Sequence, residues 1–352
     1  MKVFHCSHCR EVVFFENTRC VHCGYTLAYV QDLAEVAAME PLVAGLWRIP
    51  ARAVRRRRFR LCLNYSQESV CNWAVAAEDP LSLCESCRLT QIIPNLAIPG
   101  NREAWFKLEA AKRRVIYSLM QLQCPIETRL QDPEGGLAYE FLSDTDPHTP
   151  VLTGHASGVI TVNIAEADDA ERERRRLQLG EPYRTLLGHF RHEIGHYYWQ
   201  RLVANSPRLE QFRTVFGDER SDYAAALKMH YQNGPPTDWQ QSFVSAYAAA
   251  HPWEDWAESW AHYLHMSDML ETAADCGLSL VPRRRDEPVL LRARSGTEEP
   301  FERLIASWFP LTYILNNLNR GMGLADGYPF VLSTPAIAKL RFVHDTIVGT
   351  KE

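Results

Sequence analysis

Eight of the ten cysteines fall within the first 87 residues, and this clustering constrains the fold more than any other feature of the chain. The first four form two C-x-x-C pairs separated by ten residues: Cys6, Cys9, Cys20 and Cys23. In a reducing compartment, pairs at this spacing are typical of metal ligands rather than of disulfides. We therefore expect a closed, tetrahedral structural zinc site in a small zinc ribbon over residues 1–35.

A second group of four cysteines follows, and only half of it has the C-x-x-C spacing: Cys62, Cys71, Cys84 and Cys87. We predict a second structural zinc module over residues 61–98, although the spacing leaves open whether the two sets interleave. A module of about 40 residues buries too little surface to fold unaided, so bound metal would supply the missing stability. The segment 36–60 between the modules is predicted as a linker, preceded by a short helix around Leu33–Met39.

The overall composition is that of a folded soluble protein, with 46% hydrophobic residues, 23% charged residues and a net charge of −5. No apolar run approaches the ~18 residues of a membrane span, and the start MKVFHCSHCR has no signal-peptide core. We therefore expect a cytoplasmic protein that does not enter a membrane. The basic run Arg52–Arg60 has no interleaved aromatic residue beyond Phe59, so a solvated face is favoured over contact with nucleic acid.

An H-E-x-x-H motif lies in the string HFRHEIGHYYW, within a Pro-free stretch from Tyr183 to Ser206 that predicts a helix. Positions i and i+4 share a helix face, so His192 and His196 can bind one metal ion together. Glu193 then lies where its carboxylate can reach a water on the metal, as in zinc peptidases. His189 shares this face, but we interpret it as a packed residue or as a neighbour of the ligands.

A third protein ligand is expected in the downstream string HPWEDWAESWAHYLH. Pro252 suits the first turn of a helix, and acidic residues suit its positive end. We favour Glu254 as the ligand and Glu258 as the acceptor of an N–H from a ligand histidine; the reverse assignment is the main alternative. Tyr247 precedes Glu254 by seven residues and is a candidate hydrogen-bond donor to an oxyanion, one of 14 tyrosines in the chain.

The remaining pattern predicts an α+β protein in which the cysteine modules precede a mainly helical domain with a small β-sheet, residues 99–352. Asn101 is a candidate cap for a helix that ends near Gln121. Strands are expected at Leu137–Leu142 and Val151–Ile164. Within the second, Val159–Ile164 is our candidate for an exposed edge strand that holds a substrate backbone, and an ordinary sheet strand is the alternative. We expect a loop at Arg283–Pro300.

The chain resembles the bacterial zinc-binding metallopeptidases that carry an N-terminal zinc ribbon. The resemblance covers most of the chain and includes the strings LCLNYSQESVCNW, CESCRLTQIIPNL, GHFRHEIGHYYW, FGDERSDYAAAL and NRGMGLADGYPFVLS. More distantly, PWEDWAESW is similar to the glutamate helix of compact gluzincins, a branch of the zincin peptidases. That resemblance implies a zinc-binding role for Glu254 and a role for a preceding tyrosine, which Tyr247 matches.

These features together lead us to expect a zinc metallopeptidase with one catalytic and two structural zinc ions. Glu193 would act as the general base towards a water that zinc activates. The substrate would be a peptide or protein, recruited in part by the zinc ribbons. The alternative is a zinc-ribbon binding or regulatory protein whose peptidase fold cleaves little.

Overall fold

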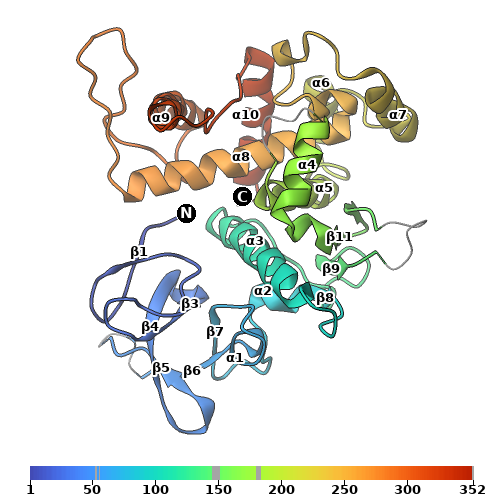
Figure 1. The fold of residues 1–352 in the computed structure, drawn as a ribbon. Helices are drawn as coiled ribbons and strands as arrows, with labels where there is room; N and C mark the ends of the chain where they lie inside the picture. Colours follow the sequence, from blue (N-terminus) through green and yellow to red (C-terminus); the bar gives the residue numbers. More distant parts are fainter. Residues whose placement is uncertain (52–53, 55, 145–150, 180–183, 351–352) are drawn as a thin grey trace.

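The computed structural model describes residues 1–350 except 52–53, 55, 145–150 and 180–183, so part of the basic run lies outside the described residues. The N-terminal third carries eight of the ten cysteines and most of the short strands, and the remainder is rich in helices with one small sheet (Figure 1). Helix α3 (Asn101–Gln121) lies between these two parts. No helix among the described residues is long and apolar enough to cross a membrane.

The N-terminal part begins with a two-stranded antiparallel sheet, β1 (Phe4–His5) and β2 (Val12–Val13). Five further strands close into a small barrel, in the order β3 (Thr26–Val30), β4 (Glu35–Pro41), β5 (Trp47–Arg48), β6 (Phe59–Leu61) and β7 (Trp73–Ala76). Short helices α1 (Leu63–Ser66) and α2 (Glu85–Arg88) follow Cys62 and Cys84, which are their N-cap residues. The barrel therefore connects the two cysteine groups.

The helix predicted around Leu33–Met39 is wrong, because β4 occupies this segment. Its sequence EVAAMEP is rich in good helix formers, but β4 pairs with β3 from Glu35 to Met39 and buries Val36 and Met39. Ala34 makes the turn between the two strands in the left-handed conformation, with φ of 48°. The segment 36–60, predicted as a linker, thus contains β5 and most of β4 as parts of the barrel.

The second sheet has four strands in the order β10-β11-β9-β8. They are β8 (Thr90–Ile92), β9 (Ala138–Leu142), β10 (Gly154–Ala156) and β11 (Val159–Asn163). The strand expected over Val151–Ile164 is therefore two strands, which turn at Ser157 and Gly158. The edge-strand prediction for Val159–Ile164 is also wrong, because β11 pairs with β9 on one side and with β10 on the other, and β10 lies at the edge.

Among the residues that the structure describes, the helical part contains seven α-helices after α3: α4 (Asp169–Leu179), α5 (Leu186–Leu202), α6 (Leu209–Phe216), α7 (Tyr223–Asn233), α8 (Pro252–Asp275), α9 (Phe301–Gly321) and α10 (Thr334–Val348). The N-cap of α3 is Gly100 rather than Asn101, whose side chain instead donates to the carbonyl of Asn95. Residues 283–300 form the expected loop between α8 and α9.

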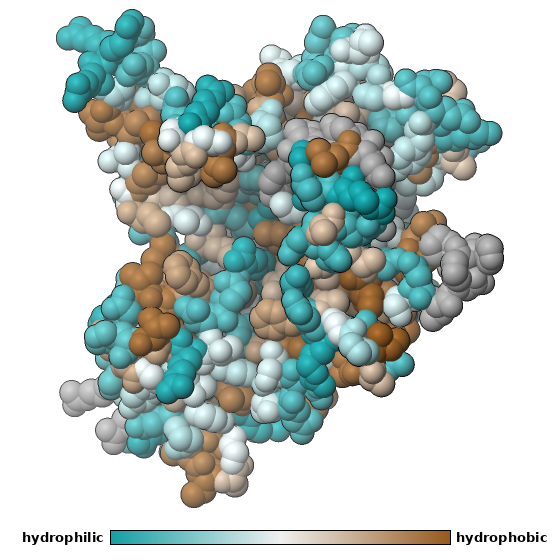
Figure 2. Space-filling model, in the orientation of Figure 1, coloured by the Kyte–Doolittle hydropathy of each residue, from teal (hydrophilic) through white to brown (hydrophobic). Residues whose placement is uncertain are grey.

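One hydrophobic core extends through both parts of the molecule. The rings of Phe4, Phe15 and Tyr29 pack around Tyr117 of α3, with centroid separations of 6.3, 5.2 and 5.9 Å. The surface is a mixture of polar and apolar residues. Hydrophobic residues, brown in Figure 2, form patches on the lower part of the view. The N-terminal part exposes Phe14 and Val21, with 69% and 92% of their area accessible.

The close approach of α5 and α8 sets the geometry of the candidate site. A Cβ atom at Gly195 would lie 3.0 Å from the Cα of Ala257, so only glycine lets the two helices come this close. The indole N–H of Trp256 donates to the carbonyl of Gly195 at 2.8 Å and fixes the register of the crossing. The H-E-x-x-H face of α5 is thereby held against the first turns of α8.

Candidate metal centres

The first four cysteines converge at one point. The Sγ atoms of Cys6 and Cys23 are 3.7 Å apart, and those of Cys9 and Cys20 are 3.6 Å apart. Four Zn–S bonds of about 2.3 Å in a tetrahedron place the sulfur atoms about 3.8 Å apart, whereas a disulfide would need about 2.05 Å. The spacing therefore fits a metal-thiolate centre.

The second four cysteines form a separate, fully buried centre, so the two sets do not interleave. Here the Sγ atoms of Cys71 and Cys84 are 3.7 Å apart. Backbone N–H groups point at the sulfurs, from Cys84 to Cys62 at 3.3 Å and from Trp73 to Cys71 at 3.4 Å. Such amides stabilise thiolates, as expected around a metal.

A third group joins α5 to α8. The Nε2 atoms of His192 and His196 are 3.2 Å apart, and Glu254 Oε2 lies 3.0 Å from the first and 3.6 Å from the second. Two nitrogen atoms that bind one zinc ion through bonds of about 2.05 Å, at a tetrahedral angle, lie about 3.3 Å apart. The separation of the two Nε2 atoms matches this value. The helix ends support this placement, since Thr185 caps α5 and His251 caps α8 ahead of Pro252.

The chemistry of this third group fits a divalent cation. Glu254 is 1% exposed, and its Oε2 has no hydrogen-bond partner although it faces two imidazole nitrogens. An orphaned buried carboxylate oxygen is costly unless a cation or donor satisfies it. Burial raises the pKa of Glu254, but the contacts with His192 and His196 outweigh burial and lower it. The group therefore presents an ionised carboxylate and two nitrogens, which are the preferred ligands of zinc.

The outer nitrogen of one histidine is held by a second carboxylate. Glu258 Oε1 lies 2.7 Å from His192 Nδ1, and its Oε2 accepts a hydrogen bond of 2.6 Å from the Ser245 hydroxyl. The structure thus places Glu254 against the Nε2 atoms and Glu258 against Nδ1. Ser245 precedes the first residue of α8 by seven positions, and no sequence pattern marked it as part of the site.

The other two predicted residues lie at the same site. Glu193 is half-buried on α5, one residue from His192. Tyr247 begins the short 3-10 helix η5 (Tyr247–Ala250), and its ring centroid is 5.9 Å from that of His192. Burial raises the pKa of Tyr247, so its hydroxyl keeps its proton and remains a hydrogen-bond donor.

Tyr223 is a second residue at the site, beside Ser245, that the sequence analysis did not identify. The hydroxyl of Tyr223, the first residue of α7, donates to Glu254 Oε1 at 2.6 Å. Tyr223 lies 31 residues before Glu254, and its helix shows no pattern that separates it from the other tyrosines. The sequence signal is limited to the capping residue Asp222, which marks the start of α7.

The remaining histidines near these helices have other partners. His189 Nδ1 lies 3.1 Å from Glu166 Oε2, and His262 shares a 2.6 Å hydrogen bond with Tyr328. Within the part of the chain that the structure describes, only the three groups above bring His, Cys, Asp or Glu atoms together for a metal ion.

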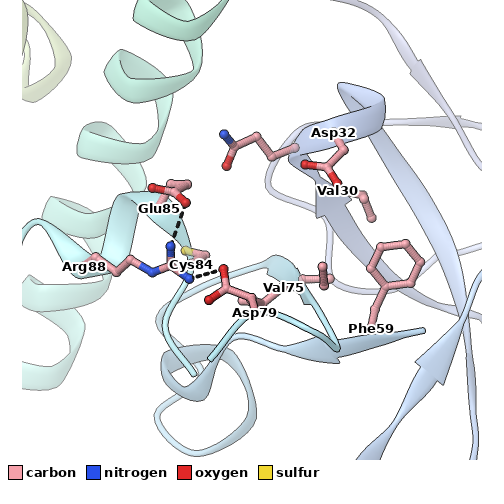
Figure 3. A pocket seen from close by; sticks show the side chains of 11 residues that line it. Val30, Asp32, Phe59, Val75, Asp79, Cys84, Glu85 and Arg88 are labelled. Atoms are coloured by element: carbon pink, nitrogen blue, oxygen red, sulfur yellow. Dashed lines mark hydrogen bonds and ion pairs between the residues drawn. The ribbon is translucent and has the colours of Figure 1, made fainter. Parts of the chain in front are cut away.

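A cavity of about 80 Å3 lies between the barrel and the second cysteine centre (Figure 3). Arg88 extends between Asp79 and Glu85 and forms ion pairs with both, the second at 2.7 Å. Arg88 is thus already engaged by two carboxylates, and its ion pair with Asp79 links α2 to the segment that follows β7.

Comparison with known proteins agrees with this architecture. The family described as "Putative zinc-binding metallo-peptidase" matches residues 101–346, and a zinc-ribbon domain matches residues 3–98. The chain therefore belongs to this zinc-binding metallopeptidase family. It is 43% identical over 348 residues to "Uncharacterized protein Rv2568c" of Mycobacterium tuberculosis and to "Uncharacterized protein Mb2598c" of Mycobacterium bovis, covering 99% of this chain and 95% of each relative. No solved structure matches the chain.

Proposed function

We propose that this protein is a zinc-dependent peptidase of the gluzincin type, with a zincin-like domain over residues 99–352. The observation that carries the proposal is the orphaned Oε2 of Glu254, which faces the Nε2 atoms of His192 and His196. A zinc ion held by these three residues would supply a Lewis acid that polarises the scissile carbonyl and lowers the pKa of water to about 7.

Glu193 is the general base in this proposal. It follows a ligand residue on α5, and its half-buried carboxylate can accept the proton of the attacking water. The same carboxyl group then returns the proton to the leaving amine. Tyr247 keeps its proton because of burial, and its hydroxyl would donate a hydrogen bond to the oxyanion of the tetrahedral intermediate.

The edge strand β10 is the proposed binding site for the substrate backbone. It lies at the end of the sheet order and packs against α5, the helix that carries the H-E-x-x-H motif. An extended peptide that adds to this edge would form main-chain hydrogen bonds independent of its sequence. Side-chain pockets near the site would then set specificity.

The two cysteine centres would each hold one structural zinc ion, for a total of three. We further propose that the N-terminal part recruits protein substrates through its exposed apolar residues Phe14 and Val21. Exposed apolar groups of this size are typical of contact surfaces when they gather in a patch. Replacing both with serine in the full chain should lower kcat/KM for unfolded casein but not for a short fluorogenic peptide.

The decisive test of the catalytic proposal combines elemental analysis with turnover. The wild type should contain about three zinc ions per chain, and Glu254→Ala about two, because the cysteine centres are closed. Glu193→Gln should keep three zinc ions and lose cleavage of a mixed fluorogenic peptide library. Two zinc ions in the wild type, or full activity in Glu193→Gln, would contradict the proposal.

A further inference from the structure

Helix α7 brings an additional side chain to the third metal centre. Tyr223 is the first residue of this helix, and its hydroxyl donates to Oε1 of Glu254, the oxygen turned away from the histidines. A carboxylate that could rotate freely would offer either oxygen, or both, to a cation. The hydrogen bond removes this freedom, because it engages one oxygen and leaves Oε2 directed at the Nε2 atoms.

The ring of Tyr223 is fixed by the start of the helix that carries Glu254. Its centroid lies 5.2 Å from that of His251 and 5.7 Å from that of Trp253, in edge-to-face arrangements. Trp253 in turn packs on the ring of His196, with a centroid separation of 4.0 Å. Tyr223 therefore contacts the ligand carboxylate directly and one ligand histidine through a single intervening ring.

The backbone just before α7 is tied to the same place. His251 Nδ1 accepts the N–H of Trp253 at 3.1 Å, so Nε2 carries the proton and donates to the carbonyl of Ser221 at 3.1 Å. This hydrogen bond sets the position of the α7 start relative to the first turn of α8. The ring contacts of Tyr223 and the backbone contact at Ser221 together place the Tyr223 hydroxyl against Glu254.

The rest of α7 lies at the surface and touches η5, where the ring centroid of His230 is 5.8 Å from that of Tyr247. None of its side chains is buried, and Tyr223 itself is 37% exposed. Gly217 before the helix and Gly234 after it both have positive φ, at 103° and 76°, where other residues are strained. A tyrosine that served only to fill the core would be buried. Here the ring is partly open to water, and the hydroxyl reaches a buried carboxylate.

We propose that Tyr223 is a positioning residue for the metal site. It holds Glu254 as a ligand through one oxygen and pre-organises the site before metal arrives. The proposal rests on the proposed function, because it requires Glu254 to bind zinc. Hydrogen-bond partners of metal ligands typically contribute 10- to 100-fold to metal affinity.

The test is zinc affinity of the full chain, measured by competition with a chelator that removes the third zinc ion. Tyr223→Phe keeps the ring contacts and removes only the hydroxyl, so the dissociation constant should rise about 10- to 100-fold. Tyr313→Phe is the matched control: it removes a partly exposed phenol hydroxyl on α9 and should bind zinc as the wild type does.

Turnover at different zinc concentrations separates positioning from direct catalysis. Activity of Tyr223→Phe should return as free zinc is raised to saturate the site. A loss of kcat that persists at saturating zinc would overturn the positioning role, and so would a dissociation constant within twofold of the wild type. Failure of the proposed function has a different signature, since the wild type itself would then contain only two zinc ions.

Discussion

Glu258 Oε1 lies 2.7 Å from Nδ1 of His192, on the opposite side of the ring from the Nε2 atom that faces Glu254. The carboxylate of Glu258 accepts a hydrogen bond from Nδ1–H. This hydrogen bond favours the tautomer of His192 in which Nε2 has a free lone pair. Ser245 completes this chain by donating to the other oxygen of Glu258. The imidazole is thereby oriented before any metal binds.

Removing this carboxylate should weaken the third metal centre. In Glu258→Ala the ring of His192 loses its acceptor, and we expect zinc affinity to fall about 10- to 100-fold. Chelator competition measures the change, and the zinc content of the cysteine centres should stay at two. Unchanged affinity would show that the ring is held by packing alone.

Replacing Tyr247 should affect turnover and leave metal binding intact. If its hydroxyl donates to the oxyanion, Tyr247→Phe should lower kcat by about 10²- to 10³-fold. Zinc content should stay at three ions per chain, and KM should change little. If Tyr247→Phe also lost zinc, the hydroxyl of Tyr247 would instead act by holding the metal ligands in place.

A buried arginine links α3 to the second cysteine centre. Arg113 is 2% exposed and donates to the carbonyl of Val70. Burial lowers the pKa of Arg113, but the negative charges around it, Cys71 first and then Glu109, Cys87 and Cys84, outweigh burial and raise it. Arg113→Met should leave the thiolate charge uncompensated and cost about 3 kcal/mol in the free energy of unfolding.

The neighbouring arginine provides the control for this measurement. Arg114 forms a partly exposed ion pair with Glu16, so Arg114→Met should cost about 0–1 kcal/mol. Urea unfolding of both variants gives the comparison. Equal stability of the two variants would contradict the role of Arg113 as a counter-ion.

Acid should destabilise the protein through His265. Burial lowers the pKa of His265 to about 4, whereas an unfolded chain has a histidine pKa of about 6.5. Between these values the unfolded state binds the additional proton, so stability is present above pH 6.5 and is lost as pH falls towards 4. At pH 5 the loss from this residue is about 2 kcal/mol.

Substitution of this histidine should flatten the pH dependence. His265→Gln should lose about 2 kcal/mol less than the wild type between pH 7 and pH 5. The measurement is the urea midpoint at both pH values, because effects of acid on the metal centres are common to both proteins. If the wild type and His265→Gln lost the same free energy of unfolding between pH 7 and pH 5, the assignment would be wrong.

The sequence reveals most about groups whose geometry is local. The C-x-x-C pairs, the i, i+4 histidines and the acidic first turn at Glu254 each depend on spacing within one element. These features predicted the three clusters that the structure brings together. The family is likewise recognisable from the same strings.

What the sequence did not reveal depends on contacts between distant segments. The alanine-rich β4 is a strand only because β3 and β5 pair with it in the barrel. The order of strands in the second sheet, and with it the identity of the edge strand, is set by parallel pairing of β9 with β8 and β11, segments that lie far apart in the sequence. The contact of Tyr223 with Glu254 has no local signature for the same reason.

The aromatic cluster around Tyr117 has a consequence for the independence of the two parts of the chain. Phe4, Phe15 and Tyr29 cover one face of α3, and the opposite side of the helix packs towards α5. A truncated chain that began at residue 101 would expose this face to water and would tend to aggregate. The helical part of the chain therefore relies on the N-terminal part to cover an apolar face of α3.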